Sequence, residues 1–108
     1  MTATYFLSDL HLDHKGIVKF RTCFESTEQH DATIKENYHK IVRPKDTVIF
    51  GGDVAFSPVA IQDLKSWSGT KHLVLGNHDH SEYKKRGVSL DMLREVFGDN
   101  IFGFYRLA

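Results

Sequence analysis

Short apolar runs alternate with amphipathic helical patterns along this chain, and that alternation limits its fold more than any other feature. Four β-favouring runs are spaced along the sequence: Ala3–Leu7, Thr47–Phe50, Lys71–Leu75 and Ile101–Leu107. Because strands connected by helices pair in parallel, the pattern predicts an α/β fold with a mostly parallel sheet and covering helices. Thr47–Phe50 shows no polar alternation, so we expect that strand to be buried on both faces.

Each predicted helix starts after a hydroxyl side chain that can cap it, namely Ser26, Ser57 or Ser89. Apolar side chains recur at helical spacing after each cap, and we expect them to face the sheet: Ile34, Tyr38, Ile41 and Val42; Val59, Ile61, Leu64 and Trp67; and Leu90, Leu93, Val96 and Phe97. His30 is expected on the solvated side of the first helix. The charged residues Glu82–Arg86 are expected to form a loop.

The chain is short, balanced in charge and poor in cysteine. Its 108 residues suffice for one small domain. Lys plus Arg number 14, as do Asp plus Glu, so the charge gives no reason to expect a nucleic acid or an anionic membrane as partner. No apolar run is long enough to span a bilayer. Cys23, the sole cysteine, rules out an internal disulfide, and the composition predicts a cytoplasmic protein.

Acidic, amide and imidazole side chains follow three of the predicted strands. They stand at the carboxyl ends of those strands: Asp9 and His11; Asp53; and Asn77, His78 and Asp79. In parallel sheets the ligand site lies beyond these ends, so we expect the side chains to gather at one edge. Oxygen and imidazole donors without thiolates suit divalent ions such as manganese, iron, zinc or nickel. Two ions roughly 3.5–4 Å apart can clamp a phosphoryl group, and Asp53, from the middle strand, is placed to bridge them.

Simpler uses exist for each of these residues. Asp9 and Asp53 also suit turns or caps, and Asn77 after a glycine is ordinary turn chemistry. His78 can be a loop histidine with satisfied hydrogen bonds. His14 lies close enough in sequence to contact a substrate, and it suits a helix entry equally well. The occurrence of all these groups after strands favours metal binding.

Three short motifs carry a resemblance to a known family. Asp9-Leu10-His11, Gly52-Asp53 and Gly76-Asn77-His78-Asp79 occur in this order, each after an apolar strand. The pattern resembles the calcineurin-like metallophosphoesterases, and Ser8–Phe56 most resembles the small bacterial and phage members. The likeness covers nearly the whole chain and matches the N-terminal half of the family's domain. It implies a partial α/β/β/α sandwich in which the second sheet is missing.

The resemblance also implies a ligand set. Asp9 and His11 would bind a first divalent ion, Asn77 would bind a second, and Asp53 would bridge the two. Manganese is the ion we expect first, with iron, zinc or nickel as alternatives.

The catalytic roles implied by the resemblance fall on the last motif. His78 would act as general acid toward the leaving oxygen or steady the phosphate. Asp79 would orient His78 by accepting a hydrogen bond from its ring. The reaction would be in-line attack of hydroxide on phosphorus.

The chain departs from the family after His80, where no further histidine occurs. Members of the family carry a later histidine and a G-H-x-H block that complete both ions. Without them the first ion would lack one ligand and the second would lack two, so this chain would hold as few as one ion. We therefore expect one truncated metallophosphoesterase domain over residues 1–108, with an edge of Ile101–Leu107 open for pairing.

Three hypotheses for the function follow. The first is a metal-dependent phosphoesterase that hydrolyses a small phosphomonoester or phosphodiester, with nucleotides among the candidates. The second is a truncated or degenerate module that acts by binding. The third is half of a split enzyme, completed by a second chain or by a copy of itself.

Overall fold

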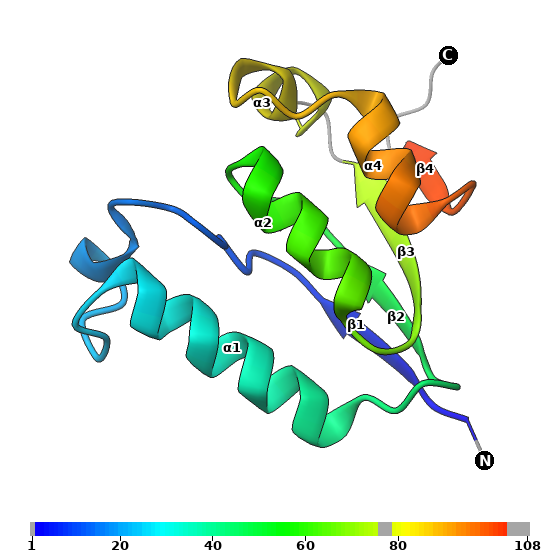
Figure 1. Ribbon diagram of the computed structural model, residues 1–108, viewed down its shortest axis with the longest axis horizontal. Helices are drawn as coiled ribbons and strands as arrows, with labels where there is room; N and C mark the ends of the chain where they lie inside the picture. Colours follow the sequence, from blue (N-terminus) through cyan, green and yellow to red (C-terminus); the bar gives the residue numbers. More distant parts are fainter. Residues whose placement is uncertain (1, 76–78, 104–108) are drawn as a thin grey trace.

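The computed structural model describes residues 2–75 and 79–103 of the chain (Figure 1). Four strands form one sheet in the order β1-β2-β3-β4, and every neighbouring pair is parallel. Their bounds are β1 (Thr4–Leu7), β2 (Thr47–Phe50), β3 (Thr70–Leu75) and β4 (Ile101–Gly103). The α/β class and the parallel sheet predicted from the strand–helix alternation are thus confirmed. The remainder of the fourth predicted strand, residues 104–108, lies outside the described residues.

Helices connect the strands, and three of the four described α-helices start at the predicted caps, while the helix over Asp79–Lys85 was not predicted. The α-helices are α1 (Thr27–Ile41), α2 (Pro58–Asp63), α3 (Asp79–Lys85) and α4 (Leu90–Phe97), with short 3₁₀ turns η1 (Ile17–Lys19) and η2 (Leu64–Ser66). The hydroxyls of Ser26, Ser57 and Ser89 each accept a hydrogen bond from a backbone N–H in the first turn. Each bond satisfies a donor that the start of a helix leaves without an intrahelical partner.

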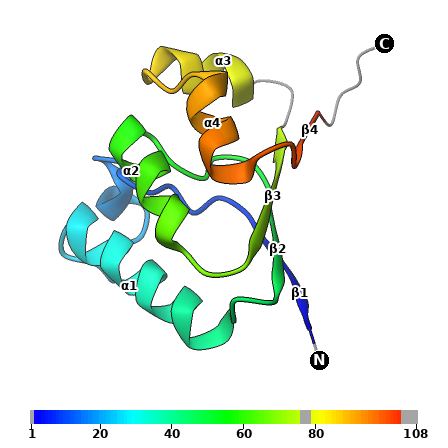
Figure 2. The ribbon, with the colours of Figure 1, turned by 45° about the vertical axis from the view of Figure 1, so that its right-hand side comes forward.

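The core lies between one face of the sheet and the helices that cover it (Figure 2). Val48 and Phe50 of β2 and Leu73 of β3 are fully buried there, against Ile61 of α2 and Leu93 of α4. Burial of these side chains supplies the main driving force that holds helices on the sheet. None of the described helices has the length and apolar character needed to cross a membrane.

The opposite face of the sheet is uncovered in the described part of the chain. Phe6 of β1 is 76% exposed and Phe102 of β4 is 50% exposed. β2 is therefore buried on one face only, with Val48 and Phe50 inside and Thr47 and Ile49 half-buried. The prediction that β2 is buried on both faces was wrong, because all the covering helices lie on the same side. The arrangement agrees with a sandwich that lacks its second sheet.

Two predicted inward residues point elsewhere. Ile41 is 57% exposed and Val59 is 75% exposed. Ile41 lies at the end of α1, beside the open edge of β1, and Val59 lines a hollow between α1 and α2. Ile61 of α2 and Leu64 of η2 are buried as predicted, and Val59 lies on the other side of the helix from Ile61.

The predicted charged loop at residues 82–86 is wrong in part, since α3 continues to Lys85. Tyr83 is buried and anchors the helix to the core. Glu82 forms ion pairs with Lys85 and Arg86 at helical spacing, which supports a helix on its solvent side. These charged side chains therefore lie on the solvent-facing side of α3 and at its end.

Candidate metal centre

Two loops lie side by side where β1 and β2 end, and backbone hydrogen bonds fix their register. The Asp9 N–H donates to the carbonyl of Gly52 at 2.9 Å, and the His11 N–H donates to the carbonyl of Asp53 at 2.9 Å. Gly51 permits the close approach, because a Cβ at that position would lie 3.0 Å from the Cβ of Ser8. The pairing brings residues from two distant parts of the sequence to one point.

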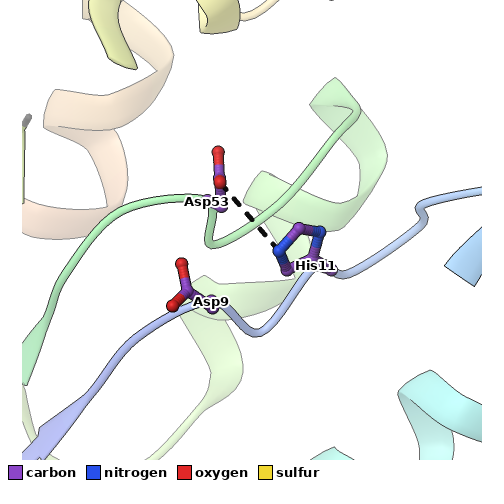
Figure 3. Close-up of side chains that lie close together, drawn as sticks. All are labelled: Asp9, His11 and Asp53. Carbon is purple, nitrogen blue, oxygen red and sulfur yellow. Dashed lines mark ion pairs between the residues drawn. The ribbon is translucent and has the colours of Figure 1, made fainter. Parts of the chain in front are cut away.

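Asp9, His11 and Asp53 converge there (Figure 3). One ligand atom from each side chain lies within 4.8 Å of the others, and His11 Nε2 is 3.9 Å from Asp53 Oδ2. Asp9 is exposed, whereas His11 and Asp53 are half-buried. The structure thus gathers two carboxylates and an imidazole at the carboxyl edge of the sheet.

All three residues adopt a left-handed backbone, with φ of 56° at Asp9, 55° at His11 and 51° at Asp53. Residues other than glycine populate this region sparsely, at a cost of about 1–3 kcal/mol each. Such strain persists only where the surroundings impose it, and it clusters at functional sites. All three residues whose side chains gather here therefore have this backbone conformation.

The surroundings of His11 favour its neutral form. Burial lowers its pKa from the ordinary value, and the nearby charge of Arg21 lowers the pKa further, while Asp53 acts in the opposite direction. Neutral imidazole is the form that binds metal ions. His11 Nδ1 is buried without a hydrogen-bond partner in the described part of the chain.

The donor set fits a divalent cation. Carboxylate oxygens suit manganese or magnesium, and imidazole suits zinc, iron or nickel. Two ligand atoms that bind one ion at about 2.0–2.2 Å lie at most about 4.4 Å apart, and the 3.9 Å between His11 and Asp53 is within that limit. The ligand atom of Asp9 lies within 4.8 Å of those of His11 and Asp53.

The predicted residues after β3 are only partly described. Asn77 and His78 lie outside the described residues, so the structure neither joins them to the three gathered side chains nor separates them. The backbone of Asp79 begins α3, and its side chain lies outside the description. β3 runs parallel to β2 and next to it, so Leu75 ends at the same edge of the sheet as the two loops.

His14 lies beside the gathered ligands. Its ring centroid is 5.3 Å from that of His11 and 4.5 Å from that of Phe56. Phe20 stacks on the outer side of His14 at 6.4 Å, and its side chain is exposed. We call His14, Phe20 and Phe56 the aromatic wall. The Arg86 guanidinium sits 3.8 Å over the Phe56 ring and places a cation near this wall.

Sequence reasoning missed two groups that hold the ligand loop. Arg21 donates hydrogen bonds to the carbonyl oxygens of Asp9 and Leu10. His30, expected on the solvated side of α1, is fully buried and contacts Arg21. The spacing of His30 from Ile34, one helical turn away on the apolar side, is the signal that could have placed it inside.

Comparisons with known proteins agree with this architecture. The profile of the calcineurin-like phosphoesterase family matches residues 3–108. The gene 66 protein of Mycobacterium phage L5 is 36% identical over 84 residues, which are 73% of this chain and 41% of that protein. The uncharacterized protein MJ1445 of Methanocaldococcus jannaschii is 33% identical over 93 residues, 82% of this chain and 53% of that protein.

A solved structure shares the fold. The protein of unknown function AQ665 from Aquifex aeolicus superposes with a TM-score of 0.68 at 26% identity, over 99% of this chain and 55% of that one. The chain thus spans about half the length of the relatives it matches. With the family profile matching nearly all of its residues and the Asp-His-Asp group at the expected edge of the sheet, the chain belongs to the calcineurin-like phosphoesterase family.

Proposed function

We propose that this chain forms part of the metal site of a phosphoesterase that hydrolyses a small phosphomonoester or phosphodiester. The observation that carries the proposal is the convergence of Asp9, His11 and Asp53 from two neighbouring loops. Their donor chemistry suits a divalent cation, with manganese as the first choice. The class of reaction, phosphoester hydrolysis, is inferred from membership of the calcineurin-like phosphoesterase family.

Asp9 and His11 would hold one ion, and Asp53 would bridge it to a second ion bound by Asn77. A divalent cation bound there supplies charge stabilisation for the phosphoryl oxygens and activated water near neutral pH. The Asp53 carboxylate would offset part of the repulsion between two such cations. His11 contributes a neutral nitrogen because its surroundings lower its pKa.

His78 and Asp79 would serve the leaving group. Hydrolysis breaks the bond between phosphorus and the ester oxygen, and water adds a hydroxyl to phosphorus and releases its other proton to solvent. His78 would donate its proton to the departing oxygen, which leaves as an alcohol. Asp79 would accept a hydrogen bond from the other N–H of the His78 ring and so stabilise the imidazolium form that donates the proton.

The aromatic wall supports a substrate with a flat organic group. Phe20 presents an exposed ring next to His14, and such a ring can stack on a nucleobase or an aryl group. We propose that His14 contacts the substrate from this position. Nucleotides and aryl phosphates both have the required shape.

Hydrolysis of bis(p-nitrophenyl) phosphate with added Mn²⁺ tests the proposal. We expect the chain to exceed the rate of Mn²⁺ in buffer, and we expect Asp53→Asn and His78→Ala each to lower that rate by about 10²-fold or more. Asp91→Asn is the matched control, because Asp91 lies exposed on α4 with Arg94 as its ion-pair partner. Equal rates for the chain, both site variants and the buffer would refute activity of this chain.

A second candidate is half of a split site that another chain or a second copy completes. The uncovered sheet face with Phe6 and Phe102 favours it, since exposed aromatic side chains on one face are typical of a contact surface. Mixing inactive Asp53→Asn and His78→Ala chains tests this candidate. Recovery of hydrolysis in the mixture supports a shared site. If the parent chain is active and the mixture of the two variants is not, the result contradicts a shared site.

A further inference from the structure

A chain of hydrogen bonds connects helix α1 to the ligand loop on the side away from β2. Arg21 is the first residue of this series and donates to the backbone of the loop. One guanidinium nitrogen donates to the carbonyl of Asp9 at 2.5 Å, and the other donates to the carbonyl of Leu10 at 3.2 Å. The latter nitrogen also lies 2.8 Å from Nε2 of His30. Arg21 therefore binds the backbone of one proposed ligand and a buried ring at the same time.

Asp31 forms the second link. Its Oδ1 lies 2.8 Å from Nδ1 of His30, and its Oδ2 accepts a hydrogen bond from the Asp13 N–H at 2.8 Å. This series of hydrogen bonds thus starts at the carbonyl of Asp9 and returns to the same loop at the N–H of Asp13. It spans the segment that carries both Asp9 and His11.

The partners of His30 fix its protonation. A guanidinium can only donate, so Nε2 must accept from Arg21, and a carboxylate can only accept, so Nδ1 must carry the proton toward Asp31. The ring is fully buried, and Phe24 packs edge-on against it at 5.0 Å. His30 is therefore a neutral ring locked in one tautomer between a cation and an anion.

The charges at the two ends also matter for a cation site. Arg21 places a positive charge on the backbone of Asp9, which by itself would oppose binding of a divalent ion. Asp31 supplies a compensating negative charge through His30, at hydrogen-bonding distances throughout. The set is neutral as a whole and holds the loop without repelling the ion.

We propose that Arg21, His30 and Asp31 are positioning residues of the metal centre, which hold Asp9 and His11 in their left-handed conformation through the backbone of the loop. This inference rests on the proposed function, since it assigns a cation to that loop. Asp9, His11 and Asp13 all have φ between 55° and 59°, and the hydrogen-bond chain binds the first and last of them.

The substitution Asp31→Asn disrupts this series of hydrogen bonds at one known position. The introduced amide has one acceptor and one donor group, whereas the site needs two acceptors, for the His30 and Asp13 N–H groups. Either orientation sets two donors against each other, or forces His30 to move its proton toward Arg21. Asp63→Asn is the matched control, because Asp63 also binds a cation, Lys35, and an aromatic N–H, that of Trp67.

Titration calorimetry with Mn²⁺ measures the effect, at a temperature where circular dichroism shows all variants folded. We expect Asp31→Asn to weaken Mn²⁺ binding roughly 10–100-fold, the range seen when support for a metal ligand is removed. Asp63→Asn should stay within about twofold of the parent chain. Parent-like affinity in Asp31→Asn would overturn the inference.

Arg21→Lys gives a second test that keeps the charge. A lysine ammonium lacks the planar fork that serves two carbonyls and a ring nitrogen together, so we expect weakening of Mn²⁺ binding by about tenfold or more. Arg94→Lys on the exposed face of α4 is its control. If both Arg21→Lys and Asp31→Asn bind Mn²⁺ as tightly as the parent chain, the positioning role is contradicted.

Nuclear magnetic resonance of the metal-free chain separates this inference from the proposed function. A parent chain that binds no Mn²⁺ would overturn the metal site, and the hydrogen-bond chain would still be tested by ring and amide signals. We expect the His30 ring to show a proton on Nδ1, and Asp31→Asn to shift the amide signals of residues 9–13. Unchanged loop signals in Asp31→Asn, with Asp63→Asn as reference, would exclude the positioning role.

Discussion

At the scale of single residues, the proposed ligands differ in how much charge they bring to the site. Asp53 comes from the middle of three strands that end together, and it pairs with His11 at 3.9 Å. Its carboxylate is the group expected to bridge two cations. Asn77 offers only a neutral carbonyl oxygen. The affinity of a cation site follows the charge of its ligands, so the two residues should not be equivalent.

We therefore expect Asp53→Asn to reduce Mn²⁺ affinity more than Asn77→Ala does. The difference should be about tenfold or more, which corresponds to about 1.4 kcal/mol. Titration calorimetry on both variants measures it. The reverse order of affinities would contradict the proposed ligand assignment.

Residue-level expectations succeeded where one local signal decides the outcome. The serine caps act through bonds three residues apart, so the sequence alone locates them. His30 and Arg21 could not be assigned in this way. Their partners lie in another segment, and only the folded backbone brings the Asp9 carbonyl to the Arg21 guanidinium. The left-handed backbone at Asp9 and His11 has the same origin.

At the scale of elements, the site depends on how closely the β1 and β2 loops approach. Gly51 stands at the tightest point of that approach. A Cβ there would lie 3.0 Å from the Cβ of Ser8, an atom fixed to the backbone.

Gly51→Ala should therefore lower the free energy of unfolding by about 1–3 kcal/mol, as overpacking does, and should weaken Mn²⁺ binding as well. Gly16→Ala is the control, because a Cβ at Gly16 meets its nearest atom only at 3.8 Å. Urea unfolding of both variants checks the difference. Equal stability in the two would show that the loops can separate freely.

Asp46 joins the entry of β1 to the turn before β2. Its carboxylate accepts hydrogen bonds from the Ala3 N–H and the Arg43 N–H, each at 2.9 Å. The Arg43 N–H bond, followed by that of Ala3, lowers the pKa of Asp46 below its ordinary 3.8. Because the folded state binds this proton less readily than the unfolded state, the stabilisation is present above pH 3.8 and is lost as the pH falls through the folded pKa.

Asp46→Asn should thus be less stable than the parent chain at pH 7, and its stability should change less between pH 5 and pH 3. Urea unfolding at both ends of this range provides the measurement. A parallel loss of stability with acid in the two proteins would assign the pH dependence to other carboxylates.

The same scale shows where periodicity alone misleads. The four strands and the starts of α1, α2 and α4 follow from apolar runs and caps, and the structure confirms them. Helix α3 was not predicted, because its charges resemble a loop, although Tyr83 anchors it. Val59 was expected on the apolar side of α2 but is exposed, because it lies two residues before the buried Ile61 and therefore on the other side of the helix.

At the scale of the whole molecule, the part of the sheet that the structure describes has one covered and one uncovered face (Figure 2). On the uncovered face, β-sheet register aligns Phe6 with Ile49 and His72 in one row. His72 stacks on Phe102 at 6.0 Å. Apolar side chains in such rows favour association with another apolar surface.

We expect the chain to associate as its concentration rises, and Phe6→Thr combined with Ile49→Thr to suppress the association. Threonine suits a strand as well as the replaced residues do, so the sheet should persist. Sedimentation velocity over a range of concentrations measures the effect, with circular dichroism as a check of folding. Association that is unchanged in the double variant would place the contact elsewhere.

The pairing of the loops after β1 and β2 allows one bound cation to connect two segments that are far apart in the sequence. Asp9 precedes α1 and Asp53 follows β2, so all of that helix and strand lies between them. One cation held by both carboxylates would act as a removable crosslink that closes this long stretch of polypeptide into a ring. Loading with metal should then protect α1 from proteases along its whole length, far beyond the few side chains that touch the ion.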